Sequence, residues 1–269
     1  MKAGGQRVPQ SSCVNQGALS ADFKTLFPDG VAAAELRGQG DASLLQPVES
    51  AGLGRAVQTR VQEFAAGRSC ARLALAQFGI HDFPLPARSD RQPAWPPSMV
   101  GSITHTAGLC AAVVGEAARF LGLGLDCEVV GDVEPELWPK ICVPRETAWL
   151  RSLPPDQQAR ASALIFAAKE AFYKCQYPAA GEFLGFHDIR LEIGGWDSGP
   201  AVFEVHASRA RALAVATFAK FPVLGTYRFH EQYVSAGVAL AASIGLVVAK
   251  HLDRREQNDL DVQHRRPAP

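Results

Sequence analysis

Two acidic residues two positions apart are the first pair in this sequence that could do chemistry. Asp126 and Glu128 follow Gly122-Leu-Gly-Leu125, an apolar stretch that predicts a short buried strand. Because residues two apart on a strand share a face, the two carboxylates should stand side by side, with Cys127 pointing away. Neighbouring carboxylates repel unless a positive charge lies between them, and Mg²⁺ is the simplest such charge. The alternative is a strand end that runs into a polar loop, which a lone D-x-E pair favours.

A third acid and a lysine lie in a helical pattern that runs from 157 to 176. The pattern contains Phe166-Ala-Ala-Lys-Glu-Ala-Phe-Tyr-Lys174. Glu170 and Lys174 are four residues apart and so share one helical face. Phe166 is also four residues from Glu170, which places the acid at the border of the buried stripe, where it can reach into a cleft. The alternative is an ordinary surface salt bridge, which stabilises a helix very little.

Basic residues recur in an earlier predicted helix over residues 53–79, which ends at Gly79 as at a C-cap. Arg60, Arg68 and Arg72 are spaced by eight and four residues, so they share one helical face. Such a stripe could bind an anion, or it could simply be solvated.

The remaining elements follow from turn residues and apolar runs. Five prolines predict a loop over 84–97, and a strand, turn and strand over 99–115 follow, with His105 at the end of the first strand. His105 could donate to an anion or could simply cap the strand. Residues 134–163 are expected to be a looped, partly exposed aromatic region that contains Trp138 and Trp149. Further strands are predicted at 189–193, 201–206, 226–230 and from 234 onward.

The bulk composition narrows the classes of function. The chain has 269 residues, and its 27 basic and 27 acidic side chains balance, which argues against a general nucleic-acid or membrane-surface binder. The six cysteines have no zinc-site spacing and the N-terminus has no leader pattern, so a cytoplasmic protein is expected. The longest apolar run, 234–249, is shorter than a membrane-spanning helix and predicts a buried strand or helix.

Three short stretches recur in the same order in the two halves of the chain. Residues 64–72 match 166–174 with Arg72 opposite Lys174, 78–83 match 184–189, and 101–114 match 227–240 with His105 opposite His230. We therefore predict an α+β protein with two similar helix-plus-antiparallel-sheet lobes related by a pseudo-twofold. The predicted parts are a disordered tail over 1–20, lobes over 21–135 and 136–250, and a second disordered tail over 251–269. Because one chain supplies both lobes, a monomer with its site between them is expected.

These motifs carry a resemblance to a known family. Residues 64–72, Trp95-Pro-Pro-Ser-Met-Val-Gly-Ser-Ile-Thr-His105, Gly124-Leu-Asp-Cys-Glu128 and Phe166–Lys174 occur in the order found in 4′-phosphopantetheinyl transferases. The resemblance covers about residues 50–245. It is to the large pseudo-dimeric class typified by the surfactin and enterobactin synthetase activators, and most of all to its actinobacterial members.

The resemblance implies a reaction and a metal site. Asp126, Glu128 and Glu170 would hold Mg²⁺ with the pyrophosphate of coenzyme A, and the Cys127 carbonyl would lie close by. Glu170 would deprotonate a serine of an apo acyl, polyketide or peptidyl carrier protein. The serine oxygen would attack the β-phosphate, and 3′,5′-ADP would leave. Such a reaction depends on positioning and charge neutralisation, which these residue types provide.

The resemblance also implies which residues bind coenzyme A. Lys174 would neutralise the phosphates, and Leu184 would line the pocket. The remaining contacts to the nucleotide and its phosphates would come from Arg60, Arg68, Thr104 and His105. Where relatives carry a basic residue in the loop before Trp95, this chain has Asp90, so Arg91 would replace it.

Two other functions remain open at this point. A metal-dependent nuclease or phosphodiesterase also collects acids and a lysine, but many place that element on a strand, whereas Glu170 lies in a helical pattern. A non-catalytic coenzyme A-binding or carrier-docking protein is the other alternative. The presence of all three acids and Lys174 weighs against it. Trp138 and Trp149 are candidates for a docking surface, or else locally buried aromatics.

Overall fold

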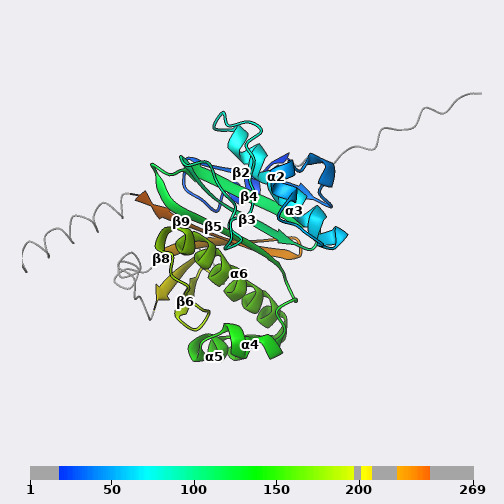
Figure 1. The fold of residues 1–269 in the computed structure, drawn as a ribbon. Coiled ribbons are helices and arrows are strands. Elements are labelled where there is room, and N and C mark those ends of the chain that lie inside the picture. Colours follow the sequence, from blue (N-terminus) through cyan, green and yellow to red (C-terminus); the bar gives the residue numbers. More distant parts are fainter. Residues whose placement is uncertain (1–17, 197–200, 208–222, 243–269) are drawn as a thin grey trace, which may run out of the picture.

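Figure 1 shows the computed structural model of the protein, which describes residues 18–196, 201–207 and 223–242. The protein is of the α+β class, and all strands that pair within these described ranges are antiparallel. Most of the first predicted tail, the whole second tail and the end of the apolar run after 242 lie outside the described residues. Residues 18 and 19, however, form a short strand that pairs with the chain at 34 and 35. No helix within the described residues is both long and apolar enough to cross a bilayer.

Two sheets form the centre of the fold. The first has the order β1-β2-β4-β3, with β1 Ala18–Leu19, β2 Val31–Arg37, β3 Met99–Thr106 and β4 Leu109–Glu116. The second has the order β5-β9-β8-β7-β6, with β5 Phe120–Val129, β6 Ile189–Gly194, β7 Val202–Ala207, β8 Val223–His230 and β9 Tyr233–Ala241. The predicted hairpin at 99–115 and the predicted later strands are confirmed, whereas β2 was not predicted.

A long helix packs on each sheet, α3 on the first and α6 on the second (Figure 1). The helices are α1 Ala21–Lys24, α2 Pro47–Ser50, α3 Gln58–Ala76, α4 Trp138–Ile141, α5 Pro144–Ser152 and α6 Pro155–Ala180, with short 3₁₀ turns at Ala42–Leu44 and Pro135–Leu137. The helix predicted from 53 begins at Gln58 instead, because residues 51–55 form turns. The proline-rich segment 84–97 is a loop, as predicted.

The prediction of a looped region over residues 134–163 is wrong. Most of this region is helical, in α4, α5 and the first turns of α6. The prolines misled the prediction because Pro144 and Pro155 occupy the first helical position, where proline has no hydrogen bond to lose. Trp138 is 6% exposed and therefore belongs to the core, while Trp149 is half-buried against Trp196. The buried-aromatic interpretation is thus the correct one for Trp138.

The internal repeat is visible in the topology. In the first half, β2, α3 and the hairpin β3–β4 give the strand order β2-β4-β3. In the second half, β5, α6 and the hairpin β8–β9 give the matching order β5-β9-β8, with β6 and β7 added at the edge. His105 and His230 lie at the ends of the equivalent strands β3 and β8, as the sequence match predicted. Because β5 pairs with β9, it belongs to the second sheet, although the predicted first lobe extends to residue 135. The lobe boundaries themselves remain a prediction.

Candidate active site

Two glycines bring α6 unusually close to the acidic strand β5. A Cβ atom at Gly124 would lie 1.8 Å from the Ala171 carbonyl oxygen, and one at Gly122 would lie 2.1 Å from the Cys175 carbonyl oxygen. Only glycine allows so close an approach of two backbones. The Gly-x-Gly pair therefore does more than begin a buried strand, because it sets the helix that carries Glu170 and Lys174 directly against the strand that carries Asp126.

Asp126 is at the centre of the site, buried with only 4% of its surface exposed. Its Oδ1 accepts a hydrogen bond from Lys174 Nζ at 2.6 Å and another from the Thr104 hydroxyl at 3.0 Å. Its Oδ2 is also buried, yet no hydrogen-bond partner for it exists among the described residues. A buried carboxylate oxygen without a partner is costly, so this atom fits a site that a cation completes.

Glu128 and Glu170 are half-buried beside Asp126. Burial and the neighbouring Asp126 carboxylate raise the pKa of Glu128 to about 8. Burial, with a smaller contribution from Asp126, also raises the pKa of Glu170, although Lys174 opposes the shift. Raised values of this kind mean that the three acids hold negative charge together only at a cost. Carboxylate oxygens suit a hard cation such as Mg²⁺, which usually completes its coordination with water and phosphate oxygens.

Lys174 supplies the nearest positive charge. Burial works to lower its pKa, but Asp126, Glu170 and Glu128 outweigh that effect, and the net shift is upward. Lys174 is therefore firmly charged. Its Nζ also lies 3.4 Å from the Leu125 carbonyl oxygen, so the ammonium group is held on β5.

Arg60 and His105 extend the site from the acids toward α3. Arg60 donates to His105 Nε2 at 2.9 Å and forms an ion pair with Glu63 at 3.3 Å. Burial lowers the pKa of His105, and the nearby Arg60 and Lys174 lower it further against the opposing effect of Glu63. His105 is thus neutral near pH 7 and accepts from Arg60. About half of the Arg60 side chain is exposed, so its remaining donors are open to a ligand.

Arg68 and Arg72, predicted on the same helical face as Arg60, are used elsewhere. Arg68 is 5% exposed, donates to the Leu85 carbonyl oxygen and stacks on Phe64, and burial lowers its pKa to about 10. Arg72 pairs with the buried Glu49 at 2.7 Å. The role of Arg68 in nucleotide binding stays a prediction.

Cys127 and Leu184 both lie in hydrophobic cores. The Cys127 thiol is buried and accepts a hydrogen bond from Ser235, so it is turned away from the acids as strand alternation predicts. Leu184 is 5% exposed and belongs to the core of the second half. The predicted roles of the Cys127 carbonyl and of Leu184 as a pocket residue stay predictions.

Aromatic side chains next to Glu170 were missed from the sequence. Tyr173 stacks on Tyr177 at 5.2 Å between ring centroids and meets the edge of Phe183 at 5.5 Å. Phe183 is 70% exposed, which is unusual for a large apolar side chain. The signal was present, because Tyr173 and Tyr177 lie three and seven residues after Glu170 and therefore share its helical face.

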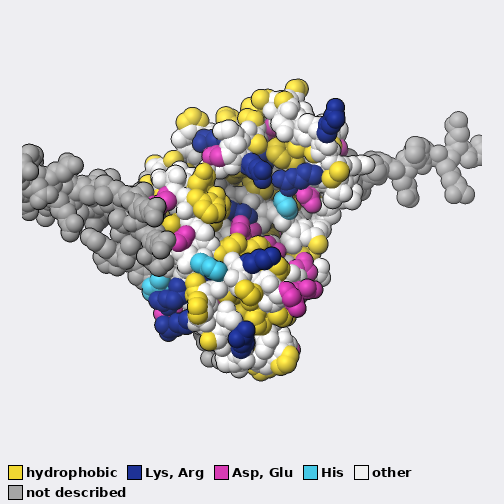
Figure 2. Space-filling model, turned by 60° about the horizontal axis from the view of Figure 1, so that its bottom comes forward, with side chains coloured by type: hydrophobic (Ala, Val, Ile, Leu, Met, Phe, Trp, Pro, Cys, Tyr) yellow, Lys and Arg dark blue, Asp and Glu magenta, His cyan; other side chains and the backbone are white. Residues whose placement is uncertain are grey.

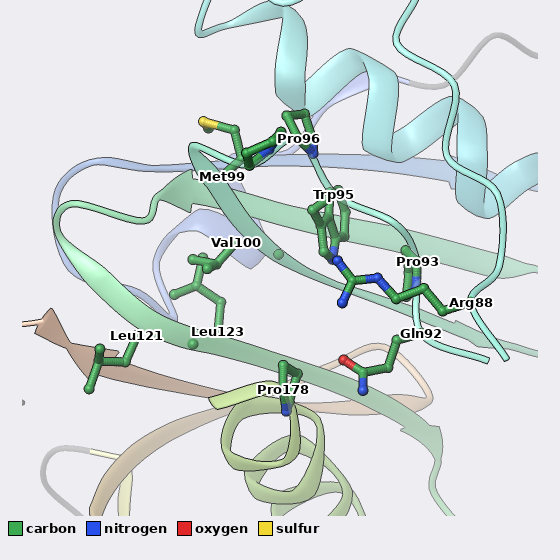
Figure 3. Close-up of a pocket in the computed structure, with 13 residues that line it drawn as sticks. Arg88, Gln92, Pro93, Trp95, Pro96, Met99, Val100, Leu121, Leu123 and Pro178 are labelled. Atoms are coloured by element: carbon green, nitrogen blue, oxygen red, sulfur yellow. The ribbon is translucent and has the colours of Figure 1, made fainter. Parts of the chain in front are cut away.

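The proline-rich loop places Arg88 rather than Arg91 at a cavity, and the predicted role of Arg91 in nucleotide binding stays a prediction. Asp90 closes a turn by accepting from the Gln92 backbone and side chain, and Arg91 lies at the exposed tip of that turn. Arg88, however, lines a cavity of about 180 Å³ together with Trp95 and Pro178 (Figure 3). The cavity lies between β3, β5 and the end of α6, one helical turn beyond Lys174.

Comparisons with known proteins identify the family of the chain. Residues 49–115 match the model of the 4′-phosphopantetheinyl transferase N-terminal domain, and residues 122–231 match that of the 4′-phosphopantetheinyl transferase superfamily. The chain is 33% identical to the 4′-phosphopantetheinyl transferase Npt of Nocardia iowensis over 67% of this chain and 82% of that protein. The chain belongs to the 4′-phosphopantetheinyl transferase superfamily.

Two further members of the superfamily are similar to it. PptT of Mycobacterium tuberculosis is 35% identical over 64% of this chain and 77% of its own length. Svp of Streptomyces mobaraensis is 38% identical over 56% of this chain and 62% of its own length. The region matched by the N-terminal model contains Arg60, and the region matched by the superfamily model contains Lys174 and the three acids Asp126, Glu128 and Glu170.

The surface of this superfamily member is hollowed between its halves. Figure 2 shows a depression across one face, with acidic and basic side chains at its floor and a row of basic side chains with a histidine along one rim. The positive charge that a polyanionic ligand needs is thus local, although the whole chain is neutral.

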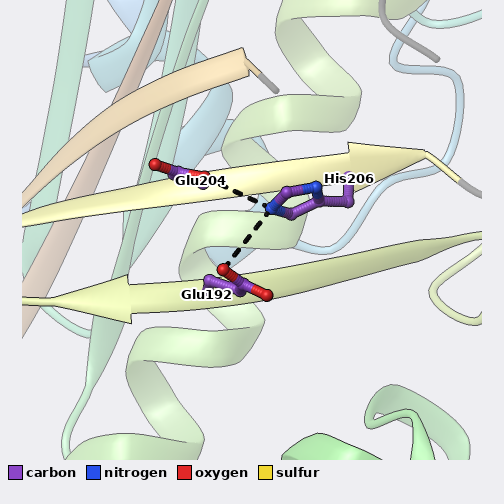
Figure 4. A group of neighbouring side chains, drawn as sticks. All are labelled: Glu192, Glu204 and His206. Atoms are coloured by element: carbon purple, nitrogen blue, oxygen red, sulfur yellow. Dashed lines mark ion pairs between the residues drawn. The ribbon is translucent and has the colours of Figure 1, made fainter. Parts of the chain in front are cut away.

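A second group of potential metal ligands lies on β6 and β7, at the edge of the second sheet. Among the described residues, only Glu192, Glu204 and His206 place three such atoms within 4.8 Å of one another (Figure 4). Glu192 is already neutralised by a close ion pair with Arg190 and a longer one with Arg145. We interpret the group as an ion-pair cluster on the sheet surface. Asp126, Glu128 and Glu170 do not bring three ligand atoms within 4.8 Å of one another.

Proposed function

We propose that this protein transfers the 4′-phosphopantetheine arm of coenzyme A to a serine of an apo carrier protein and releases 3′,5′-ADP. The observation that carries the proposal is the convergence of Asp126 and Glu128 from β5 with Glu170 and Lys174 from α6, inside the regions that match the superfamily. Acyl, polyketide and peptidyl carrier proteins are the proposed partners. Because both halves of the site come from one chain, it needs no second copy, and we expect a monomer.

The acids fit a divalent cation. Asp126 Oδ2 lacks a partner, and the raised pKa of Glu128 reflects uncompensated negative charge. We propose that Asp126, Glu128 and Glu170 hold Mg²⁺. When bound, the ion would neutralise charge on the phosphate oxygens of coenzyme A.

The chain's own residues supply the rest of the reaction. The Glu170 carboxylate accepts the proton of the carrier serine hydroxyl, and its raised pKa makes it a stronger base than an ordinary glutamate. The serine oxygen then bonds to the β-phosphorus, and the bond from that phosphorus to the oxygen of 3′,5′-ADP breaks. In this proposal Lys174 balances the charge that builds up on the phosphates, and Arg60 holds the nucleotide end.

Intact mass spectrometry of an apo carrier protein tests the function. The carrier is incubated with this protein, coenzyme A and Mg²⁺, with and without EDTA. A metal-dependent gain of one phosphopantetheine group is expected. No gain with any of several carriers, together with clear coenzyme A binding in calorimetry, would mean a non-catalytic binding protein.

We propose that part of coenzyme A occupies the cavity beside Arg88 and accepts a hydrogen bond from this arginine. We expect Arg88→Ala to raise the KM for coenzyme A about tenfold or more, because a charge-assisted hydrogen bond contributes about 1.5–3 kcal/mol. Arg91→Ala, at the exposed tip of the same loop, should change the KM less than about threefold. Steady-state kinetics with coenzyme A as the varied substrate measures both. If Arg91→Ala raised the KM more than Arg88→Ala, Arg91 would be the residue that contacts coenzyme A, as the sequence predicted.

The raised pKa of Glu128 predicts how pH and Mg²⁺ act together on stability. The folded protein keeps this proton up to about pH 8, whereas an ordinary glutamate releases it near 4.5. Between these values the folded state binds more protons than the unfolded state, so metal-free stability should fall as pH rises. Mg²⁺ needs the deprotonated carboxylate, so it should raise the melting temperature more at about pH 8 than at about pH 6. Thermal unfolding with Mg²⁺ or EDTA measures this difference, and Glu128→Gln should remove most of it.

A further inference from the structure

Two hydroxyl groups on β3 connect the two sheets at the site. Ser102 and Thr104 share one face of β3, and both are buried. Ser102 Oγ accepts from the Leu125 backbone N–H at 3.0 Å, and Thr104 Oγ1 accepts from the Cys127 N–H at 3.2 Å. The two hydroxyls thus hold the strand β5 on either side of Asp126.

Thr104 differs from Ser102 because it also touches the acid. Its only hydroxyl proton is donated to Asp126 Oδ1 at 3.0 Å, so it is not available to a nucleotide. Lys174 donates to the same oxygen at 2.6 Å. Both donors therefore lie on one side of the carboxylate, and Oδ2 is left for another partner.

This arrangement matters because an aspartate carboxylate turns easily about its last torsion, whose preference is broad. Lys174 alone is a flexible cation that can follow either oxygen as the carboxylate turns. The Thr104 hydroxyl is fixed by its rigid β-branched side chain and by its bond from Cys127, so it can fix the plane of the carboxylate.

We propose that Thr104 is a positioning residue that turns Asp126 Oδ2 toward the cation. The inference rests on the proposed function, and it assigns Thr104 a part in metal binding rather than in nucleotide binding. Partners that orient a metal ligand typically contribute about 10- to 100-fold to metal affinity.

The test is Mn²⁺ affinity, measured from the electron paramagnetic resonance signal of free Mn²⁺ in the presence of 3′,5′-ADP. Thr104→Val, which keeps the shape and loses the hydroxyl, should weaken Mn²⁺ binding about 10- to 100-fold. The dissociation constant of coenzyme A measured in EDTA should stay within about threefold. Thr104→Ser keeps the hydroxyl and should bind Mn²⁺ nearly as well as the unchanged protein.

Ser102→Ala is the matched control. It removes a hydroxyl from the same strand and the same contact with β5, but no contact with Asp126. It should lower the melting temperature without weakening Mn²⁺ binding. The inference is overturned if Thr104→Val binds Mn²⁺ normally, or if Ser102→Ala loses as much affinity. If the unchanged protein transfers nothing and binds no Mn²⁺, the proposed function fails together with the inference. If the unchanged protein transfers phosphopantetheine but Thr104→Val binds Mn²⁺ with unchanged affinity, the inference is overturned and the proposed function stands.

Discussion

Glu170→Gln is expected to slow phosphopantetheine transfer by about 10²- to 10⁴-fold, the usual contribution of a general base. Glutamine has nearly the same shape, but it cannot take the serine proton and brings no negative charge to a metal. The nucleotide contacts proposed for Arg60 and Lys174 remain in place, so coenzyme A should bind with little change. Intact-mass time courses give the rate, and calorimetry in EDTA gives the affinity.

A glutamate outside the site provides the control for this substitution. Glu136 is exposed in the 3₁₀ turn Pro135–Leu137, so Glu136→Gln makes the same chemical change at a solvent-exposed residue outside the site and should transfer at the normal rate. If Glu170→Gln also transferred at that rate, the base would have to be another group, and Glu128, with its pKa raised to about 8, would be the next candidate.

The arrangement of the site could be predicted because simple periodicities determined it. Strand alternation put Asp126 and Glu128 on one face with Cys127 behind, and helical spacing put Glu170 beside Lys174. The repeat between the halves predicted equivalent hairpins in which His105 and His230 lie at the end of the first strand, and the topology confirms them. In each case the signal is local, because a residue's face depends only on its position in its own element.

The partners that side chains reach across the fold could not be predicted in this way. Helical spacing put Arg60, Arg68 and Arg72 on one face, yet each meets a different partner: His105, the Leu85 carbonyl and Glu49. Those partners come from segments far apart in sequence, and spacing within one helix carries no information about them. The helices α4 and α5 were missed for a different reason, since prolines at their first turns resemble loop signals.

A buried ion pair repeated in both halves was also missed. Glu146 is the third residue of α5 and accepts from the Val143 N–H, the Leu191 N–H and Lys169 Nζ, the last at 2.7 Å. Glu49 in α2 accepts in the same way from Gln46, Leu85 and Arg72. The acid and the cation are 23 residues apart in both halves. By contact, the counterpart of Arg72 is therefore Lys169, and the sequence match of Arg72 with Lys174 is wrong.

Glu146→Ala is expected to destabilise the protein by about 3–5 kcal/mol, because it leaves a buried cation without its counter-ion. The Lys169 side chain has no exposed surface, and within the described part of the chain its ammonium group hydrogen-bonds, besides Glu146, to the carbonyl oxygens of Ile141, Phe186 and Ile189. Such a loss is a large fraction of a typical folding free energy of about 5–15 kcal/mol. Urea unfolding followed by circular dichroism measures it.

Glu49→Ala provides the comparison that isolates the buried charge. Both substitutions remove a helix cap and a bond from a distant backbone N–H, but Arg72 keeps 16% of its side chain in solvent and can be rehydrated, whereas Lys169 cannot. The Glu146 variant should therefore lose more stability than the Glu49 variant. Burial already lowers the pKa of Lys169, so without Glu146 the lysine should shed its proton more readily, and the deficit should shrink as pH rises. Equal losses that do not change with pH would mean that the caps and backbone contacts, not the buried charge, make these two glutamates important.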